Sequence, residues 1–473
     1  MEQNYETDRM AQLQRRRQIR ARKRRQRRIR QILVISTAAV LLIALIVVLS
    51  LSLKSCAAGK DDTPDTTPST DPTQTEPAGP YVVSTATIGS MGDLLMHKPV
   101  FDDSTYNSAV QQADGTYDFT CVFEHLGEYT RKLDYAVANL ETTFGGDQFP
   151  YQGNPSFNCP DSLMDTLVGC GFDMLLTANN HCADTLMTGI DRTLNVVRDY
   201  DVQTLGTRLS DEEPRYAVEE INGIKVGMVC YTYTLSMVED KPNLNGNTPV
   251  AKPEQVNFFD YNNLQGFYSE MEQILSDMEN DGAEATVLYI HWGTEYELTQ
   301  NATQEKIAQK MCDLGVDVII GGHPHVVQPI DLLQSSTDPD HKTVCVYSLG
   351  NVVSNQRLGN LNAIDTAHTE DGMMFSVTFE KYSDGSVYVA GVDVLPTWVT
   401  MFDNENGKTV YAILPLDIST QAQWSQLYGL GEGTTKAAVN SHDRTMDIVG
   451  AGLTECQTYL TGAKQAREGD TAN

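Results

Sequence analysis

Apolar residues between positions 81 and about 395 recur in short runs that alternate with longer segments of helical spacing. Short apolar runs bounded by turn residues are typical of buried strands, and the longer segments place their apolar residues on one helical face. Strands are expected at 85–88, 135–138, 172–176, 225–230, 286–290, 316–320 and 343–347, and helices at 162–168, 189–200, 261–280 and 303–314. Strand and helix in alternation predict an α/β layered fold.

Beyond residue 372 the pattern changes. Strands are expected at 374–379, 387–394 and 410–414, followed by a helical segment from Ser419 and a polar tail after Gly462. We therefore expect a main domain over 81–395 and a C-terminal β/α extension with a polar tail over 396–473.

The N-terminal part contains a different kind of apolar stretch. Residues 32–53 are uncharged, and 22 residues in a helix would span about 33 Å, which is enough to cross a bilayer core. A cleaved signal peptide is one alternative, but its apolar core has only about 7–15 residues. Lipidation at Cys56 is another, although Lys54 stands where a small residue is expected. The sequence thus predicts a tail at 1–31, a transmembrane helix at 32–53 and a linker at 54–80.

Charge is distributed very unevenly around this stretch. The whole chain has a net charge of −29, yet residues 1–30 carry 12 Arg and Lys against 3 Asp and Glu, and the rest carries 22 against 60. The acidic bulk would repel nucleic acid, so a nucleic-acid partner is not expected. Basic residues stay cytoplasmic. The chain is therefore expected to be a single-pass cell-membrane protein with a cytoplasmic N-terminus and an extracellular C-terminal domain.

The segment after the predicted transmembrane helix is expected to be an extended tether rather than part of a folded domain. The segment 59–80 contains five Pro, six Thr and four Asp, so it cannot bury a core.

Eight of the nine cysteines follow this segment. Several, such as Cys230 and Cys345, stand in apolar strand-like runs, and we expect them to be buried free thiols rather than disulfides.

Polar residues gather just beyond the carboxyl ends of the expected strands, where open α/β sheets bind their ligands. Five of the nine histidines fall there, each accompanied by Asp, Glu, Asn or Gly. Imidazole with carboxylate and amide oxygens is a ligand set for Mn, Fe or Zn. The candidates for a centre of two divalent metal ions are Asp93, His97, Glu141, Asn180, His291, His323 and His325.

Each candidate also has a simpler interpretation. His97 could be an ordinary hydrogen-bonded histidine, Asn180 could cap the following helix, and His323 and His325 could belong to a tight turn after two glycines. Together, these interpretations would have to explain the same coincidence five times. A phosphate-binding loop is excluded because Phe402 stands where its first glycine belongs, and no Gly-x-Ser-x-Gly motif is present.

The order of these motifs resembles the CapA-type capsule-synthesis family, the poly-γ-glutamate capsule proteins. The resemblance covers about residues 86–354 and rests on Gly92-Asp93, Asn139-Leu140-Glu141, Ala178-Asn179-Asn180-His181, His291-Trp292-Gly293-Thr294-Glu295, Gly322-His323-Pro324-His325-Val326 with Gln328, and Tyr347-Ser348-Leu349-Gly350-Asn351. That family is similar to calcineurin-like metallophosphoesterases, which implies a four-layer α-β-β-α sandwich and a two-metal centre.

The likeness also implies a role for each residue. Asp93 and His325, with His97 as a further ligand, would hold one metal, and Asn180, His291 and His323 would hold the other. Glu141 would bridge the two, and His181 would donate a proton to the leaving group. Two features depart from the phosphoesterase pattern: three residues rather than one separate Asp93 from His97, and the bridging residue is Glu rather than Asp.

Two functions are expected from this resemblance. The first is an extracellular enzyme of capsule or exopolymer synthesis, export or attachment that acts on a phosphoester or γ-glutamyl bond. Glu295 would orient His291 or act as a base, with an ordinary surface glutamate as the alternative, and Asn139 and Asn351 are candidates for substrate binding. The second is a non-catalytic scaffold that uses the metals to bind an anionic polymer or its precursor, alone or with other membrane proteins of a capsule complex.

Overall fold

The computed structural model describes residues 79–246, 249–360 and 366–469. The expected cytoplasmic tail, the expected transmembrane helix at 32–53 and nearly all of the expected linker lie outside these residues. Among the residues that are described, no helix is long and apolar enough to cross a membrane.

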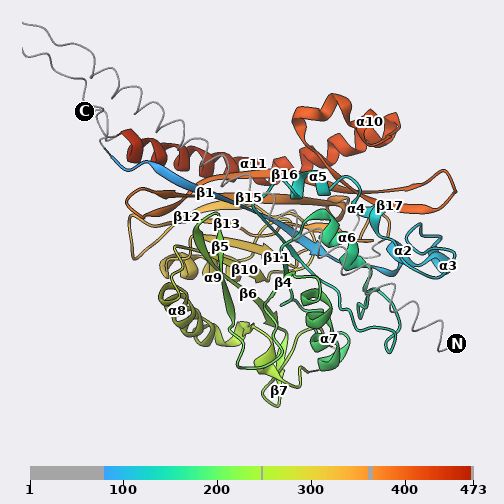
Figure 1. The fold of residues 1–473 in the computed structure, drawn as a ribbon, viewed down its shortest axis with the longest axis horizontal. Helices are drawn as coiled ribbons and strands as arrows, with labels where there is room; N and C mark the ends of the chain where they lie inside the picture. Colours follow the sequence, from blue (N-terminus) through green and yellow to red (C-terminus); the bar gives the residue numbers. More distant parts are fainter. Residues whose placement is uncertain (1–78, 247–248, 361–365, 470–473) are drawn as a thin grey trace, which may run out of the picture. The chain divides into compact units, whose positions relative to one another are not determined.

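Two β-sheets form the centre of the fold (Figure 1). The first has eight strands in the order β17-β16-β15-β1-β2-β3-β4, with β14 also paired to β1. Its strands are β1 (Val82–Leu94), β2 (Tyr135–Asn139), β3 (Met174–Leu176), β4 (Gln203–Leu205), β14 (Asn351–Val353), β15 (Asp371–Tyr382), β16 (Val387–Asp403) and β17 (Thr409–Pro415). Strands β1 to β4 are parallel, whereas β15 to β17 are antiparallel.

The second sheet has seven strands in the order β12-β13-β11-β10-β6-β5, with β9 also paired to β6. Its strands are β5 (Tyr216–Ile221), β6 (Ile224–Thr234), β9 (Phe258–Asp260), β10 (Ala285–His291), β11 (Val318–Gly322), β12 (Ile330–Gln334) and β13 (Lys342–Val346). A small hairpin, β7 (Ser236–Val238) and β8 (Lys241–Asn243), follows β6. The mixed α/β fold is confirmed, and the expected strands and helices of 85–347 fall on observed ones.

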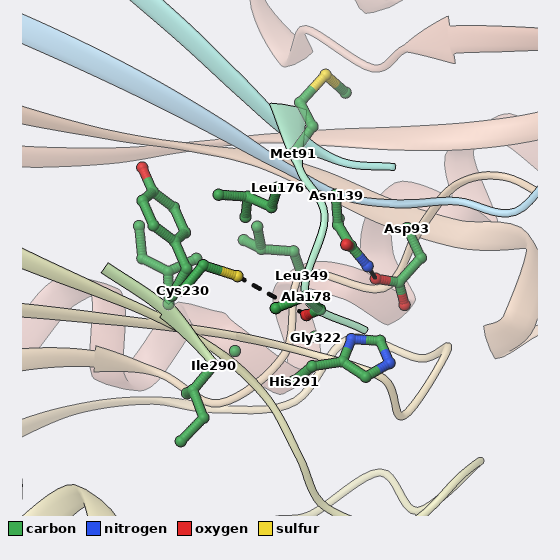
Figure 2. Close-up of a pocket in the computed structure, with 14 residues that line it drawn as sticks. Met91, Asp93, Asn139, Leu176, Ala178, Cys230, Ile290, His291, Gly322 and Leu349 are labelled. Atoms are coloured by element: carbon green, nitrogen blue, oxygen red, sulfur yellow. Dashed lines mark hydrogen bonds between the residues drawn. The ribbon is translucent and has the colours of Figure 1, made fainter. Parts of the chain in front are cut away.

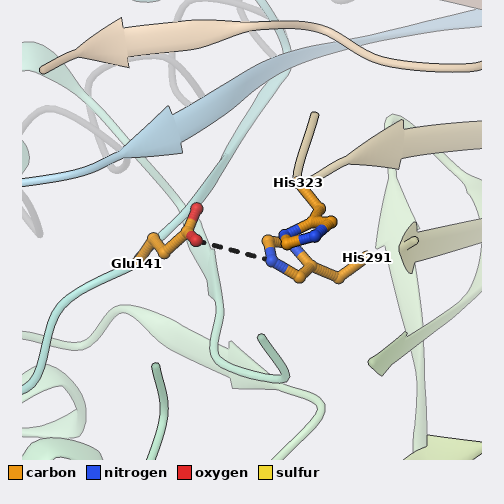
Figure 3. Close-up of side chains that lie close together, drawn as sticks. All are labelled: Glu141, His291 and His323. Carbon is orange, nitrogen blue, oxygen red and sulfur yellow. Dashed lines mark ion pairs between the residues drawn. The ribbon is translucent and has the colours of Figure 1, made fainter. Parts of the chain in front are cut away.

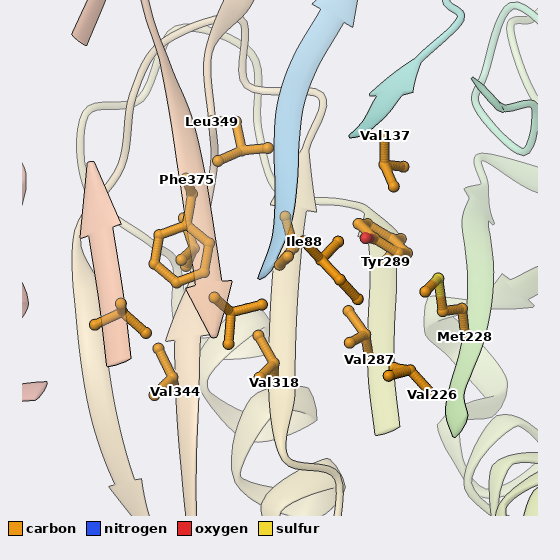
Figure 4. Packing of buried hydrophobic residues seen from close by; sticks show 14 of the residues in the cluster. Ile88, Val137, Val226, Met228, Val287, Tyr289, Val318, Val344, Leu349 and Phe375 are labelled. Atoms are coloured by element: carbon orange, nitrogen blue, oxygen red, sulfur yellow. The ribbon is translucent and has the colours of Figure 1, made fainter. Parts of the chain in front are cut away.

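The sheets share one hydrophobic core because alternate residues of their strands point to opposite faces. Ile88 and Val137 of the first sheet pack with Met228, Val287 and other residues of the second (Figure 4). On the other face of the second sheet, the intervening residues pack against α8 (Leu264–Asn280) and α9 (Ala302–Asp313).

The remaining helices are short, except for α7 and α11. They are α2 (Lys98–Phe101), α3 (Asp103–Tyr106), α4 (Thr120–Phe123), α5 (Gly127–Thr130), α6 (Leu163–Cys170), α7 (Leu186–Arg198), α10 (Trp424–Leu427) and α11 (Glu432–Gly469). The long helix α11 contributes Val449, Leu453, Cys456 and Leu460 to the core that the two sheets share. It also runs through the tail expected after Gly462, and the expected boundary at 395/396 falls inside β16. The segment after residue 395 is therefore built into the first sheet and the core.

Candidate metal centre

The carboxyl ends of the parallel strands bring the candidate side chains to one edge of both sheets. Asp93 lies at the end of β1, where it is level with Asn351 of the neighbouring β14. The adjacent Gly92 is required by close packing, because a Cβ there would lie 1.9 Å from the carbonyl oxygen of Gly350. This close approach allows the Asp93 backbone N–H to donate to the same oxygen over 3.0 Å.

The second sheet contributes the histidines. His291 is the last residue of β10, and the loop after β11 carries His323 and His325 with φ angles of 97° and 57°. Positive φ is uncommon for residues other than glycine, and it occurs often at functional sites. The preceding Gly322 leaves room for the carboxylate, because a Cβ there would lie 3.0 Å from Asp93 Oδ1.

One group of donors consists of Glu141, His291 and His323, whose ligand atoms lie within 4.8 Å of one another (Figure 3). His291 Nε2 lies 3.4 Å from Glu141 Oε1 and 2.9 Å from Asn180 Oδ1. Glu141 Oε1 and His323 Nδ1 are buried and have no hydrogen-bond partner. Buried polar atoms normally have a partner, so two orphaned lone-pair donors in one cluster fit a cation.

A second group consists of Asp93, Glu141 and His325, and it shares Glu141 with the first. His325 Nδ1 lies 3.1 Å from Asp93 Oδ2 and 3.2 Å from Asn351 Oδ1, while His325 Nε2 lies 3.9 Å from Glu141 Oε1. Asn139 joins the two carboxylates by donating to Asp93 Oδ1 over 2.8 Å and to Glu141 Oε2 over 3.3 Å. Because Glu141 belongs to both groups, it stands where a bridging ligand would be needed.

The two buried carboxyls are electrostatically different. Burial raises the pKa of Glu141 well above its usual range, and the nearby Asp93 raises it further. Burial also acts to raise the pKa of Asp93, but the hydrogen bond and the charge of His325 outweigh it and lower that pKa. A cation between the carboxylates would favour the charged form of both.

The histidines of the first group are held neutral. Burial lowers the pKa of His291 to about 3, and burial also lowers the pKa of His323 well below its usual value. Neutral imidazole is the form that binds a metal. His323 Nε2 lies 3.0 Å from the Tyr233 hydroxyl, which leaves Nδ1 as the free donor atom.

The third group adds Glu295 to His323 and His325. Unlike the other carboxylates, Glu295 is exposed. Its position places a solvent-facing acid beside two buried imidazoles, so it can reach either a cation or a ligand that enters from outside.

His181 lies in none of these groups, and a different set of residues holds it. Its Nδ1 lies 2.7 Å from Asp184 Oδ2 and 3.0 Å from Asn245 Nδ2, and its ring packs edge-on against Phe157 at 4.6 Å between centroids. The residue is 8% exposed. This arrangement orients an imidazole beside the donor groups without making it part of them.

Comparison with known proteins assigns this chain to a family. The model of the family described as "Bacterial capsule synthesis protein PGA_cap" matches residues 87–356, which is more than half of the chain and contains every candidate site residue. The chain belongs to the PGA_cap family.

Two curated relatives agree with this assignment. The protein named "PGA biosynthesis protein CapA" of Bacillus subtilis (strain 168) is 24% identical over 311 residues, which cover 64% of this chain and 70% of the relative. The protein named "Capsule biosynthesis protein CapA" of Bacillus anthracis is 24% identical over 355 residues, which cover 72% and 75%.

His97 is the one histidine among the expected ligands of this PGA_cap chain that joins none of the three donor groups. Its Nδ1 lies 3.2 Å from the Leu95 carbonyl oxygen and 3.2 Å from the Asn355 backbone nitrogen, and its ring packs edge-on against Phe157 at 5.0 Å. The pKa of His97 is lowered to about 3, chiefly by burial. The three residues between Asp93 and His97 carry the ring to this position.

The structure also identifies residues around the PGA_cap site that the sequence did not single out. Tyr233, near the end of β6, supports His323, and Asn245, just after the hairpin that follows β6, supports His181. Neither carries a local motif. Asn179 stands inside a quoted motif, and its side chain donates to Asn139 Oδ1 over 3.0 Å and to the Leu140 carbonyl over 2.9 Å.

A small cavity lies beneath the centre, between the two sheets (Figure 2). Its volume is about 20 Å³, which is enough for roughly one water molecule. Most of its lining is apolar, including Met91, Leu176 and Ile290, with Asp93 and His291 at one side. The cavity therefore has no room for a molecule much larger than water.

Proposed function

We propose that this PGA_cap chain is a membrane-anchored, extracellular protein of capsule or exopolymer synthesis that uses a divalent-metal centre to act on a phosphoester or γ-glutamyl bond. The observation that carries the proposal is the convergence of two orphaned buried atoms, Glu141 Oε1 and His323 Nδ1, with His291 and Asn180.

The donor set fits two ions. Asn180, His291 and His323 would hold one, Asp93 and His325 would hold the other, and Glu141 would serve both. When bound, divalent ions supply Lewis acidity that polarises a phosphoryl or amide carbonyl oxygen. Mixed nitrogen and oxygen donors suit Mn, Fe or Zn.

The protein's own residues would supply the remaining chemistry. The Nδ1 of His181 faces Asp184, so its other nitrogen, Nε2, is the one that would give a proton to the leaving group. Glu295 is exposed beside His323 and His325, where it would contact an incoming substrate or a bound cation.

The family and its relatives support an anionic polymer as substrate. One relative is named for PGA biosynthesis and the other for capsule biosynthesis. Residues 31–473 carry 22 basic and 60 acidic side chains, so a polyanion would be engaged at a local cationic centre rather than by the surface as a whole. Bound metal ions would provide such a centre.

The fold supports the likeness to metallophosphoesterases. Two sheets share a core, and helices cover their outer faces. We propose that this is a variant of the four-layer sandwich, in which Glu141 takes the place of the bridging Asp.

A non-catalytic, metal-dependent polymer-binding subunit is the second candidate. His97 is in none of the donor groups, which favours this candidate, because the ion at Asp93 and His325 would then have fewer protein ligands and would serve binding better than turnover. The two candidates differ in their need for His181.

The test combines metal analysis with a substrate panel on the purified full-length protein. Phosphomonoesters, phosphodiesters and γ-glutamyl peptides are each assayed after loading with Mn, Fe or Zn. Turnover that is lost in His181→Ala with metal retained supports the enzyme, and polymer binding that survives His181→Ala without turnover supports the binding subunit. A protein that takes up no metal under any loading condition contradicts both.

A further inference from the structure

A second polar site lies away from the donor groups, in a groove of about 380 Å³. The groove is lined by β4 and β5, the edge strands of the two sheets, and by the loop that joins them. Arg198 of α7 and Asp281 after α8 complete it. Three of the lining residues are arginines: Arg198, Arg208 and Arg215.

Arg208 is unusual among these arginines because two nitrogens of its buried guanidinium, Nε and Nη2, have no hydrogen-bond partner. Its side chain belongs to a residue that is only 2% exposed, and Nη1 donates to Asn257 Oδ1 over 2.6 Å. Among the described residues no carboxylate forms a close ion pair with it, and the charges of Asp211 and Glu270 act on it only from a greater distance. A buried charge without a partner is strongly unfavourable, so a compensating anion is expected.

Arg215 brings a second guanidinium to the same point. Its Nη1 lies 3.4 Å from Asn257 Oδ1, the oxygen that Arg208 also contacts, and 3.2 Å from Glu270 Oε1. Burial lowers the pKa of Arg208 to about 10, and the like charge of Arg215 lowers it further. Two guanidinium groups thus converge on one amide oxygen, and only Arg215 has a carboxylate in ion-pair contact.

Arg198, by contrast, is an arginine of this groove whose hydrogen-bond donors have partners. Its Nη1 and Nη2 donate to the two oxygens of Glu213 over 3.1 and 2.8 Å, and its Nε donates to Thr204 over 2.9 Å. It therefore needs no further partner and serves as an internal control.

We propose that Arg208 and Arg215 bind an oxyanion, a carboxylate or phosphate group, that enters through this groove. The planar fork of a guanidinium matches the geometry of both groups, and the ligand would take the hydrogen bonds that Nε and Nη2 of Arg208 now lack. None of these residues belongs to the donor groups of the metal centre, so the site is independent of the proposed catalytic function.

The experiment is a calorimetric titration of the purified full-length protein with inorganic phosphate and, separately, with glutarate. A chelator removes metal ions so that the centre cannot bind the probes, and sodium chloride replaces each probe in the reference titration. Wild type is compared with Arg208→Gln, Arg215→Gln and the control Arg198→Gln.

We expect saturable binding of at least one probe, weakened about tenfold or more in Arg208→Gln and in Arg215→Gln and unchanged in Arg198→Gln, because each guanidinium supplies charge-assisted hydrogen bonds. Binding of phosphate alone or of glutarate alone supports the site and identifies the anion. If Arg208→Gln fails to fold, Arg215→Gln carries the test. Absence of binding of both probes, or binding that both variants retain, overturns the proposal.

Discussion

The Nδ1 of His181 lies 2.7 Å from Oδ2 of Asp184, which makes the carboxylate the nearest polar partner of this imidazole. Asp184 is itself held, because its Oδ2 accepts from the Phe157 backbone N–H over 2.6 Å and its Oδ1 accepts from Asn245 over 3.1 Å. A carboxylate at this distance favours a proton on Nδ1 and fixes the ring. The orientation of His181 thus depends on a residue three positions later in the chain.

We predict that Asp184→Asn lowers the rate on a substrate found in the panel by about 10²–10⁴-fold, because the amide no longer stabilises the charged imidazole that gives up the proton. The bound metal should stay at the wild-type level, since neither residue belongs to the donor groups. Rate and metal content are measured on the same preparation.

Asn245→Ala is the matched control for this change, because it removes the amide that lies against His181 Nδ1 and donates to Asp184 Oδ1, but it keeps the carboxylate itself. Its effect should be smaller than that of Asp184→Asn. Loss of metal in Asp184→Asn, or an undiminished rate, would contradict the role given to the pair.

The composition of the donor groups predicts how much metal each variant retains relative to wild type. His323→Ala and His325→Ala should each lower the bound metal, and Glu141→Ala should lower it most, because Glu141 is the one residue common to the two fully buried groups and would serve both ions. Elemental analysis of the purified variants beside wild type measures this, with unfolding curves to detect misfolding.

His181→Ala is the control that should retain the metal. A fall in its metal content would make His181 a ligand and remove the proposed acid. Equal metal content in Glu141→Ala and wild type would show that the carboxylate does not serve the ions.

Much of this site could be predicted from sequence because parallel strands end at a common edge. Asp93, His291 and His323 follow three different expected strands, and the rule that ligands bind at carboxyl ends was sufficient to group them. Glu141 and Asn180 were found in the same way. The structure brings all five into two connected groups.

There is a physical reason why the supporting residues could not be predicted from the sequence. Tyr233 and Asn245 reach the site through the register of β6 and the path of the hairpin after it, and neither property has a local sequence signal. The position of His97 likewise depends on how the chain turns after β1. The packing of α11 into the shared core is also a tertiary property, since its apolar residues indicate only a helix with a buried face.

The topology of the chain is a separate prediction. Residues 1–30 carry 12 basic side chains, so we expect the N-terminus in the cytoplasm and the folded domain outside. External protease on intact, wall-stripped cells should digest the domain and leave a short membrane-protected fragment. A cytoplasmic marker protein must stay intact in the same sample, and full protection of the domain would reverse the topology.

The last prediction concerns the way α11 docks on the sheets. A Cβ at Gly452 would lie 1.6 Å from the carbonyl oxygen of Ile330 in β12, whereas at Gly450 the nearest atom would be Met446 Cε at 3.9 Å. Alanine has a higher helix propensity than glycine by about 1 kcal/mol, so Gly450→Ala should leave stability unchanged or raise it slightly. Gly452→Ala has the same propensity gain but must push the helix away from β12. Because that shift disturbs the packing of Leu453 and Val449, we expect a net loss of about 1–3 kcal/mol or more. Urea unfolding of both variants measures the difference, and equal stability of the two would show that α11 does not pack against β12 at Gly452.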